Sequence, residues 1–276
     1  MSAGGGLVWI DGVIRPAAEA GVGVADRGLL LGHAAFETVR CTDGRLRRWP
    51  AHRARLEGGL AYLGVARPAV LDHVEAGAEA LAQRQGLSDA VARLTVTAGE
   101  AGPGLEGDRD VAPRVILSVK ARTPAPSAVS TVVFSQPRRS GSPGERFKLS
   151  GYGDLIAARA QARAAGADRA IVCGPGGVLA CADCANLFWI RAESVFTPAL
   201  ATGALPGVTR AAMLTAAQRA GIDIKEVCAA PSDLDQAQAA FMTNAGEGVT
   251  AIASVNGRAL DPDHALIDAL SRLEAD

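Results

Sequence analysis

Three features of the chain have the residue types and the order expected of a site for a phosphorylated aldehyde. Lys148 precedes a Leu-Ser-Gly-Tyr-Gly run, Asn186 opens an Asn-Leu-Phe-Trp run, and a Pro-Gly-Val-Thr turn ending at Thr209 leads into a helical stretch. A lysine amine condenses with an aldehyde to a Schiff base when its surroundings favour the neutral amine. The first turn of a helix offers unpaired backbone N–H groups and the positive end of the helix dipole to a phosphate. The order and spacing of the three features therefore indicate an aldehyde cofactor that carries a phosphate.

Other motifs extend this pattern over nearly the whole chain, from about Val8 to Ala259. The N-terminal ones are Ala25-Asp26-Arg27-Gly28, Phe36-Glu37-Thr38-Val39-Arg40 and His52-Arg53-Ala54-Arg55-Leu56. With them the chain resembles the class IV aminotransferase family of fold-type IV pyridoxal-phosphate enzymes. That family includes branched-chain and D-amino-acid aminotransferases and 4-amino-4-deoxychorismate lyase. The spacing after Lys148 is closer to the lyase and D-amino-acid branches, and the Asn-Leu-Phe-Trp run followed by Val195-Phe196-Thr197-Pro198 is closest to the lyase.

The resemblance implies an α+β fold with two domains, like that of D-amino-acid aminotransferase. A small N-terminal α/β sandwich would be followed by a larger domain with a barrel-like sheet. We expect the N-terminal domain over residues 1–120, a linker over 121–130 and the C-terminal domain over 131–276, the last carrying the cofactor lysine. The prolines of the linker favour extended backbone, because a residue before proline avoids the helical region. The family also implies a homodimer.

The resemblance implies pyridoxal 5′-phosphate as the cofactor. Lys148 would form the Schiff base, or aldimine, and would later move a proton at the substrate carbon. Arg55 would bind the phosphate with its planar guanidinium fork, and Val208 and Thr209 would add backbone N–H groups and a hydroxyl. His52 is interpreted as a capping or packing residue and not as a general base. The remaining cofactor-binding positions of the family correspond to Cys181, Asn186, Asn244 and Ala245.

Two of these positions depart from the family's pattern. Cys181 stands where the family has a glutamate that protonates the pyridine nitrogen of the cofactor. Without that carboxylate the ring accepts negative charge less well. Asp183 would share a strand face with Cys181 and could replace the glutamate after a local shift. Ala245 stands where relatives have a hydroxyl for the phosphate, and either Thr243 or Asn244 could compensate.

The substrate side departs further from the family. Pro103 stands where the lyase pattern has an arginine, and His33 replaces the aspartate of the family's Gly-Asp-Gly segment. Arg40 is a third candidate on this side. The identity of the substrate therefore cannot be transferred from the family, although a small molecule with an amino group is expected.

Three hypotheses for the function stay open. The first is a lyase-like enzyme of folate biosynthesis that eliminates pyruvate from aminodeoxychorismate and gives 4-aminobenzoate. Cys181 favours it, because formation of an aromatic ring supplies a driving force that transamination lacks. The first alternative is a class IV aminotransferase of the D-amino-acid or branched-chain type. The second alternative is a non-catalytic homologue that binds a metabolite.

Composition argues against several other classes. The formal net charge of −1 leaves no basic surplus for nucleic acid, and no run approaches the roughly 18 apolar residues of a membrane helix. Five cysteines, an odd number, and an N-terminus without a secretory signal indicate the cytoplasm. Cys181 and Cys184 form a Cys-x-x-Cys without a second ligand pair, so we expect two small hydrophobic side chains and no metal site.

Local patterns predict the elements that position these residues. Asp11-Gly12 and Asp43-Gly44 predict two β-hairpins, because Asp-Gly turns match the twist of the strands; the second would pair residues 36–41 with 46–49. Apolar periodicity predicts helices over 51–63, 69–85 and 154–165, and from Thr209 and Ser232. Strands are predicted over 90–98, 114–120, 131–134, 170–173, 177–180 and 187–190, and near Glu226, Ala239 and Ala251. Short strands and helices without strict alternation favour α+β domains.

Overall fold

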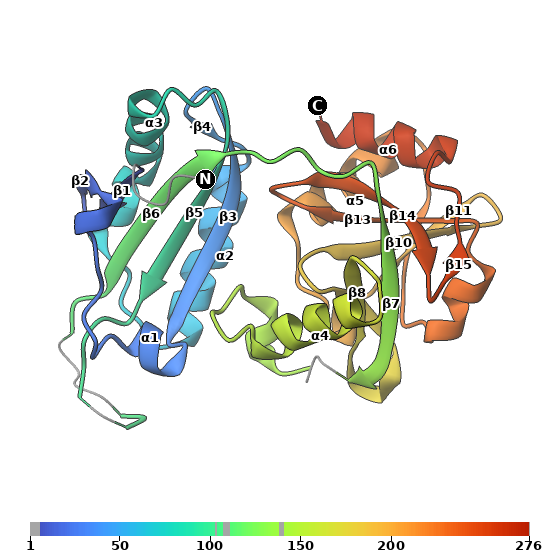
Figure 1. Ribbon diagram of the computed structural model, residues 1–276, viewed down its shortest axis with the longest axis horizontal. Helices are drawn as coiled ribbons and strands as arrows, with labels where there is room; N and C mark the ends of the chain where they lie inside the picture. Colours follow the sequence, from blue (N-terminus) through green and yellow to red (C-terminus); the bar gives the residue numbers. More distant parts are fainter. Residues whose placement is uncertain (1–5, 103, 107–110, 138–140, 276) are drawn as a thin grey trace. The chain divides into compact units, whose positions relative to one another are not determined.

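The computed structural model describes residues 6–102, 104–106, 111–137 and 141–275, and it divides the chain into two units (Figure 1). The first unit comprises Met1–Thr123 and Phe147–Gly151, and the second comprises Pro124–Arg146 and Tyr152–Asp276. The chain passes from the first unit to the second between Thr123 and Pro124, which lie inside the linker predicted over residues 121–130. Lys148, the predicted cofactor lysine, was expected in the C-terminal domain, but its segment Phe147–Gly151 belongs to the first unit.

The first unit is built on a six-stranded antiparallel sheet with the strand order β2-β1-β6-β5-β3-β4. Asp11 and Gly12 connect the first two strands with φ angles of 49° and 95°, as the Asp-Gly turn predicted. The second predicted hairpin also forms, but its return strand is only two residues long because Trp49 already begins a helix. The strands are β1 (Leu7–Ile10), β2 (Val13–Pro16), β3 (Ala34–Thr42), β4 (Arg45–Leu46), β5 (Asp89–Thr97) and β6 (Arg114–Ala121).

Helices α2 (Trp49–Tyr62) and α3 (Val74–Arg84) cover one face of this sheet (Figure 1). The alternating strand residues that point to the helices, such as Val39 and Leu94, pack with Leu56 and Leu81 in one buried cluster. Burying such side chains stabilises the unit by about 1.5–3 kcal/mol each. The short helix α1 (Arg27–Leu31) begins at Asp26, whose carboxylate accepts hydrogen bonds from the N–H groups of the first turn. A 3₁₀ turn, η2 (Ala69–His73), precedes α3.

The second unit contains a nine-stranded mixed sheet that curls into a half-barrel. Its strand order is β12-β11-β10-β13-β14-β7-β8-β9, and β15 pairs with β14. Of these neighbours, β7 pairs in parallel with both β14 and β8, and β11 pairs in parallel with β12. The strands are β7 (Ala128–Pro137), β8 (Arg169–Cys173), β9 (Leu179–Ala182), β10 (Asn186–Arg191), β11 (Ser194–Pro198), β12 (Ile224–Val227), β13 (Ala239–Asn244), β14 (Gly248–Val255) and β15 (Arg258–Ala259).

Three helices pack against this sheet. Helices α5 (Val208–Arg219) and α6 (Ala265–Ala275) contact one another, and Met213 and Leu270 pack against a stacked pair of strand residues, Phe188 and Phe241, whose ring centroids are 4.8 Å apart. Helix α4 (Gly153–Ala164) lies against β8 through small residues that include Ala158. The predicted helix near Ser232 is a 3₁₀ turn, η6 (Pro231–Gln236). None of the helices in the described part of the chain is long and apolar enough to span a membrane.

Candidate active site

Lys148 is held by the backbone of the first unit. Its segment pairs with the start of β3: the Phe36 N–H donates to the Lys148 carbonyl at 2.9 Å, and the Ser150 N–H donates to the Ala34 carbonyl at 3.0 Å. Leu149 forms an antiparallel bridge with Ala35 between these two bonds. Lys148 is half-buried. The amine therefore projects from a strand-like segment whose backbone position is fixed on both sides of the residue.

The amine of Lys148 lies over an aromatic ring. Its Nζ is 4.7 Å from the centroid of the buried Phe36 ring, and the guanidinium carbon of Arg93 is 3.8 Å from the same centroid. Cations are attracted to the negative face of an aromatic ring at such distances. Phe36 thus holds the lysine on one side of β3, next to a second cationic group.

Arg55 is fixed by a buried carboxylate. Its Nε donates to Glu37 Oε1 at 2.8 Å and its Nη2 donates to Oε2 at 2.7 Å. Glu37 is completely buried, and the Arg55 side chain is 10% exposed. Two parallel charge-assisted hydrogen bonds fix the plane of a guanidinium. Arg55 is therefore not a mobile surface arginine.

His52 completes this cluster. Its Nδ1 lies 2.7 Å from Glu37 Oε2, and the ring is buried, as the interpretation of a packing residue predicted. Burial raises the pKa of Glu37, but hydrogen bonds from Arg55 and His52 outweigh it, so the pKa lies below its ordinary value. A lowered carboxyl pKa stabilises the fold at neutral pH, and this contribution is lost as the pH falls through that pKa.

In the second unit, the start of α5 has the features of an anion site. Its N-cap is Gly207, and among the described residues no side chain caps the helix. A methyl group on Gly207 would lie 2.0 Å from Asn186 Oδ1, so only glycine allows this approach. The Asn186 Nδ2 donates to the Leu205 carbonyl at 2.8 Å. Asn186 thereby fixes the turn that presents the backbone N–H groups of Val208 and Thr209.

Thr243 adds a hydroxyl next to this turn. It is the cross-strand partner of Asn186, so the two side chains lie on the same face of the sheet. Its Oγ1 is buried and has no hydrogen-bond partner among the described residues. Asn244 Oδ1 instead accepts from the N–H groups of Gly246 and Glu247 at 3.0 and 2.7 Å. Of the two replacements predicted for the hydroxyl missing at Ala245, Thr243 is the one whose side-chain oxygen has no partner among the described residues, and its role stays a prediction.

Cys181 is buried in an apolar cluster. Asp183, which was predicted as a possible replacement for the missing glutamate, is engaged by other residues. The cluster contains Val172, the partner of Cys181 across β8 and β9. The Asp183 carboxylate is 3% exposed and accepts hydrogen bonds from both Arg159 Nε and Arg159 Nη2, the latter at 2.6 Å, and from the Ala170 N–H at 3.0 Å. Asp183 therefore belongs to a structural ion pair.

This ion pair predicts a stability effect. Changing Arg159 to Ala should lower the free energy of unfolding by about 3 kcal/mol, because it leaves the buried Asp183 carboxylate without its charged partner. Denaturant unfolding followed by circular dichroism measures the change. Arg163→Ala on the exposed side of the same helix is the matched control and should change stability by less than about 0.5 kcal/mol. Equal effects in the two variants would contradict the prediction.

Cys184, the other cysteine of the Cys-x-x-Cys motif, was predicted to be a small hydrophobic side chain, and this prediction is wrong. Cys184 is exposed, and its Sγ accepts from Arg169 Nη1 at 2.9 Å and from Arg159 Nη2 at 3.3 Å. All five cysteines are free. Among the described residues, no group of three or more His, Cys, Asp or Glu side chains is arranged to hold a metal ion.

The substrate-side predictions are placed as follows. His33 Nδ1 accepts from Arg27 Nε at 3.1 Å, and its Nε2 lies 3.0 Å from the Leu63 carbonyl. Arg27 also donates to three carbonyls of the loop after β5, the loop where the lyase pattern has an arginine that this chain lacks. These carbonyls belong to Gly102, Gly104 and Leu105, at 3.2, 2.8 and 2.9 Å. Arg40 Nε contacts Asp89 Oδ1 at 3.3 Å. Pro103 lies outside the described residues.

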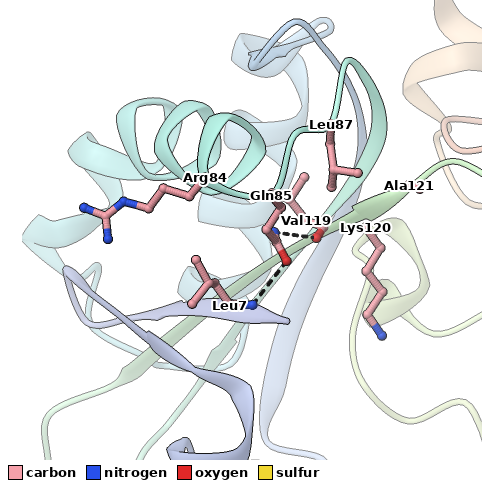
Figure 2. Close-up of a pocket in the computed structure, with 7 residues that line it drawn as sticks. All are labelled: Leu7, Arg84, Gln85, Leu87, Val119, Lys120 and Ala121. Atoms are coloured by element: carbon pink, nitrogen blue, oxygen red, sulfur yellow. Dashed lines mark hydrogen bonds between the residues drawn. The ribbon is translucent and has the colours of Figure 1, made fainter. Parts of the chain in front are cut away.

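A pocket of about 470 Å³ lies elsewhere in the first unit, between β1, β6 and the end of α3 (Figure 2). Gln85 spans its wall, because it accepts from the Leu7 N–H and donates to the Val119 carbonyl, both at 3.1 Å. Its cationic side chains, Arg84 and Lys120, point away from one another (Figure 2). None of the predicted site residues lines this pocket.

The predicted residues thus fall into two sets, one in each unit. In the first unit Lys148 contacts Phe36 and Arg55 contacts Glu37, which are consecutive residues of β3. The second unit holds the Asn186, Thr243 and α5 set. Glu37 belongs to one of the N-terminal sequence motifs, but no role was predicted for it. A signal was present, since Glu37 alternates with the apolar residues Ala35, Val39 and Cys41 on one face of β3, and an acidic residue must be paired to be buried there.

Comparison with known proteins identifies the class. The branched-chain-amino-acid aminotransferase of Escherichia coli is 23% identical over 262 residues, which cover 91% of this chain and 85% of that protein. A putative branched-chain-amino-acid aminotransferase of Methanocaldococcus jannaschii is 25% identical over 260 residues, covering 92% and 89%. Both similarities extend through the two units and include the segment of Lys148.

Solved structures have the same fold. The crystal structure of the E. coli branched-chain amino acid aminotransferase superposes with a TM-score of 0.90 at 22% identity, covering 97% of this chain and 93% of that chain. A putative 4-amino-4-deoxychorismate lyase from Legionella pneumophila superposes with a TM-score of 0.86 at 25% identity, covering 93% and 95%. These likenesses show the fold of the fold-type IV pyridoxal-phosphate enzymes. Residues 34–255 match the family amino-transferase class IV, and the chain belongs to that family.

The cofactor of this class is pyridoxal 5′-phosphate, and most of the chain's own residues fit it. Arg55, the uncapped start of α5 and the orphaned hydroxyl of Thr243 suit a phosphate, and the half-buried Lys148 amine suits an aldehyde. Cys181 is the exception, because it has a thiol at the position where the family resemblance predicted a carboxylate for the pyridine nitrogen.

Proposed function

We propose that the protein is a lyase that eliminates pyruvate from aminodeoxychorismate or a close analogue and gives 4-aminobenzoate. The observation that carries the proposal is Cys181, with Asp183 already engaged by Arg159. The bound cofactor supplies a ring that accepts negative charge from the carbon next to the substrate nitrogen. A buried thiol supports that charge less than a carboxylate does, because it is a weak acceptor without a carboxylate's charge and so does less to keep the pyridine nitrogen protonated. A reaction that ends in an aromatic ring depends less on this support than transamination does.

In this proposal the chain's residues divide the work. Lys148 binds the cofactor and then takes the proton from the substrate carbon that carries nitrogen. The electron pair left by that proton forms the last double bond of the aromatic ring as the carbon–oxygen bond to the pyruvate fragment breaks. The pair of the broken bond leaves on oxygen as an enolate, and returning the proton to the carbon of that enolate gives pyruvate. Arg55, Val208, Thr209 and Thr243 hold the phosphate, Asn186 holds the turn of α5, and Ala245 leaves room beside it.

The residues predicted to contact the substrate support the same reaction on an analogue of aminodeoxychorismate. His33 and the loop that follows β5 are joined through Arg27, so they form one connected wall in the first unit. Arg40, on the neighbouring strand, is joined to Asp89. We propose that this wall, together with Pro103, selects the substrate. The putative 4-amino-4-deoxychorismate lyase from L. pneumophila, which covers almost the whole chain, supports the reaction class.

The product distinguishes the proposed reaction from its alternative. The holoenzyme should release pyruvate from aminodeoxychorismate with no 2-oxo acid present, in an amount equal to the 4-aminobenzoate formed. Coupling pyruvate to lactate dehydrogenase measures it. A rate that depends on an added 2-oxo acid would overturn the lyase and establish an aminotransferase. The names of the curated relatives favour that alternative. Protein that stays colourless with the cofactor would indicate a binding protein without turnover.

We also propose a homodimer in the cytoplasm. Leu29, Leu30 and Leu31 of α1 are 63%, 61% and 50% exposed, and such consecutive apolar side chains on a surface suit a second copy of the chain. Five free cysteines suit a reducing compartment. Light scattering of the holoenzyme measures its mass, and a monomer at micromolar concentration would contradict the dimer.

A further inference from the structure

Glu37 is the centre of a cluster that the proposed reaction does not explain. Its carboxylate is completely buried, and both of its oxygens accept charge-assisted hydrogen bonds from Arg55, at 2.8 and 2.7 Å. His52 Nδ1 lies 2.7 Å from the second oxygen. Removing a carboxylate from water is costly unless its charge is paired and its lone pairs are satisfied. Here both conditions are met by two residues of one helix.

The two partners of Glu37 are placed by the same element. His52 and Arg55 are three residues apart on α2, so their side chains lie on one face of the helix. Glu37 comes from β3, the strand that also holds the backbone of Lys148. The cluster therefore joins α2 to the strand that positions the catalytic amine, and it does so through buried side chains that have little freedom to rearrange.

Two fixed donors determine where the rest of a guanidinium points. Arginine has five N–H donors in one plane. Because Nε and Nη2 both donate to Glu37, the direction of the remaining donors is set by the position of that carboxylate. An arginine on an exposed helix face would instead lose rotamer freedom each time it bound a phosphate.

We propose that Glu37, supported by His52, is a positioning residue that orients Arg55 toward the phosphate of the cofactor. The inference rests on the phosphate-binding role of Arg55 in the proposed function. Glu37 does not bind the phosphate, because two anions would repel one another. Its effect is therefore exerted entirely through the geometry of Arg55.

An alternative role for Glu37 predicts the opposite change in cofactor affinity when the carboxylate is removed. If the carboxylate mattered only as a charge, it would weaken the attraction between Arg55 and the phosphate, and its removal would tighten cofactor binding. If it orients Arg55, its removal weakens binding. The two roles are separated by comparing pyridoxal 5′-phosphate with pyridoxal, which has no phosphate. A change that merely loosens the fold lowers the affinity for both ligands equally.

The test measures dissociation constants of the full-length chain, freed of cofactor, for both ligands. The preference for the phosphorylated ligand is the dissociation constant for pyridoxal divided by that for pyridoxal 5′-phosphate. Arg55→Ala should reduce this ratio by about 100-fold, which corresponds to the loss of one or two charge-assisted hydrogen bonds. Glu37→Ala should reduce it by about 10-fold or more, and Glu37→Gln, which retains one acceptor for Arg55, by a smaller factor. The double variant Glu37→Ala/Arg55→Ala should equal Arg55→Ala alone, because the two residues act in series.

Two further variants separate position from charge and from folding. Glu57→Ala removes an acidic residue from the exposed side of α2, where it pairs with Arg53 and Arg67, and should leave the preference unchanged. His52→Asn keeps a side-chain N–H near Glu37 and should retain more of the preference than His52→Ala. If Glu37→Ala does not fold, Glu37→Gln and the His52 pair still give the answer.

The outcomes separate this inference from the proposed function. An unchanged or increased preference in both Glu37 variants, together with a large loss in Arg55→Ala, would overturn the role of Glu37 and leave the phosphate site standing. An unchanged preference in Arg55→Ala would overturn the phosphate site and this inference with it. A loss in the Glu37 variants that is not additive with Arg55→Ala supports the positioning role.

Discussion

Replacing Lys148 with alanine is expected to abolish covalent attachment of the cofactor and to lower turnover by about 10⁴-fold or more. In the proposed function the same amine binds the aldehyde and moves the proton, so both functions should be lost together. The fold should survive, because Lys148 is held by its backbone hydrogen bonds with β3 and these do not need the side chain. Reduction of the holoenzyme with borohydride, followed by peptide mass spectrometry, shows where the cofactor is attached.

The chain provides matched controls for this experiment. It contains three lysines, and the other two are Lys120 in β6 and Lys225 in β12. Both are exposed, and neither is placed in the site. Alanine at either position should leave attachment and turnover within a factor of about two, in keeping with the small effects of surface substitutions. Attachment to Lys120 or Lys225 in the unchanged protein would refute the assignment of Lys148.

The second large effect is expected from Gly174→Ala, which should lower the free energy of unfolding by about 3 kcal/mol, near the upper end for overpacking. A methyl group at this position would lie 1.8 Å from the Thr202 carbonyl oxygen and 2.9 Å from its carbon. Neither backbone moves easily, because the Gly174 N–H donates to the Val178 carbonyl and the Thr202 N–H to the Ala199 carbonyl. Denaturant unfolding measures the loss.

The same substitution should also weaken cofactor binding. Thr202 ends the 3₁₀ turn η5 (Leu200–Thr202), and the chain runs from there directly to the Gly207 turn before α5. A displaced Thr202 therefore shifts the backbone that presents the N–H groups of Val208 and Thr209. Gly153→Ala at the start of α4 is the control, because a methyl group there meets no atom within 4 Å. It should be neutral or slightly stabilising, and equal losses in the two variants would argue against the clash.

Much of the fold could be predicted because its signals are local. The Asp11-Gly12 turn, the helix from Thr209 and the strands around Asn186 each depend on a few neighbouring residues. Errors arose where a local signal competed with another. Residues 46–49 were predicted as a strand, but Arg48 adopts a φ of 54° and Pro50 favours the first turn of a helix, so α2 begins at Trp49. Near Ser232, the proline and aspartates form only a 3₁₀ turn.

The site was less predictable because its decisive contacts join distant residues. The pairing of Lys148 with β3 spans more than a hundred residues, and no periodicity near Lys148 reveals it. The choice of Glu37 as the partner of Arg55, and of Arg159 as the partner of Asp183, likewise depends on how strands and helices meet. Motif positions located Lys148, Arg55 and Asn186, whereas the groups that orient them required the structure.

The short segment Phe147–Gly151 has a consequence for how this protein could be divided. The polypeptide leaves its second unit, contributes five residues to the first, and returns. A cut at Thr123 therefore does not yield two self-contained modules. The N-terminal fragment would lack the segment that pairs with the start of β3, and the C-terminal fragment would carry Lys148 without the strand that supports it. The two halves of this enzyme are interlaced by the very stretch that carries its lysine, so exchanging one half with that of a relative also separates the amine from its support.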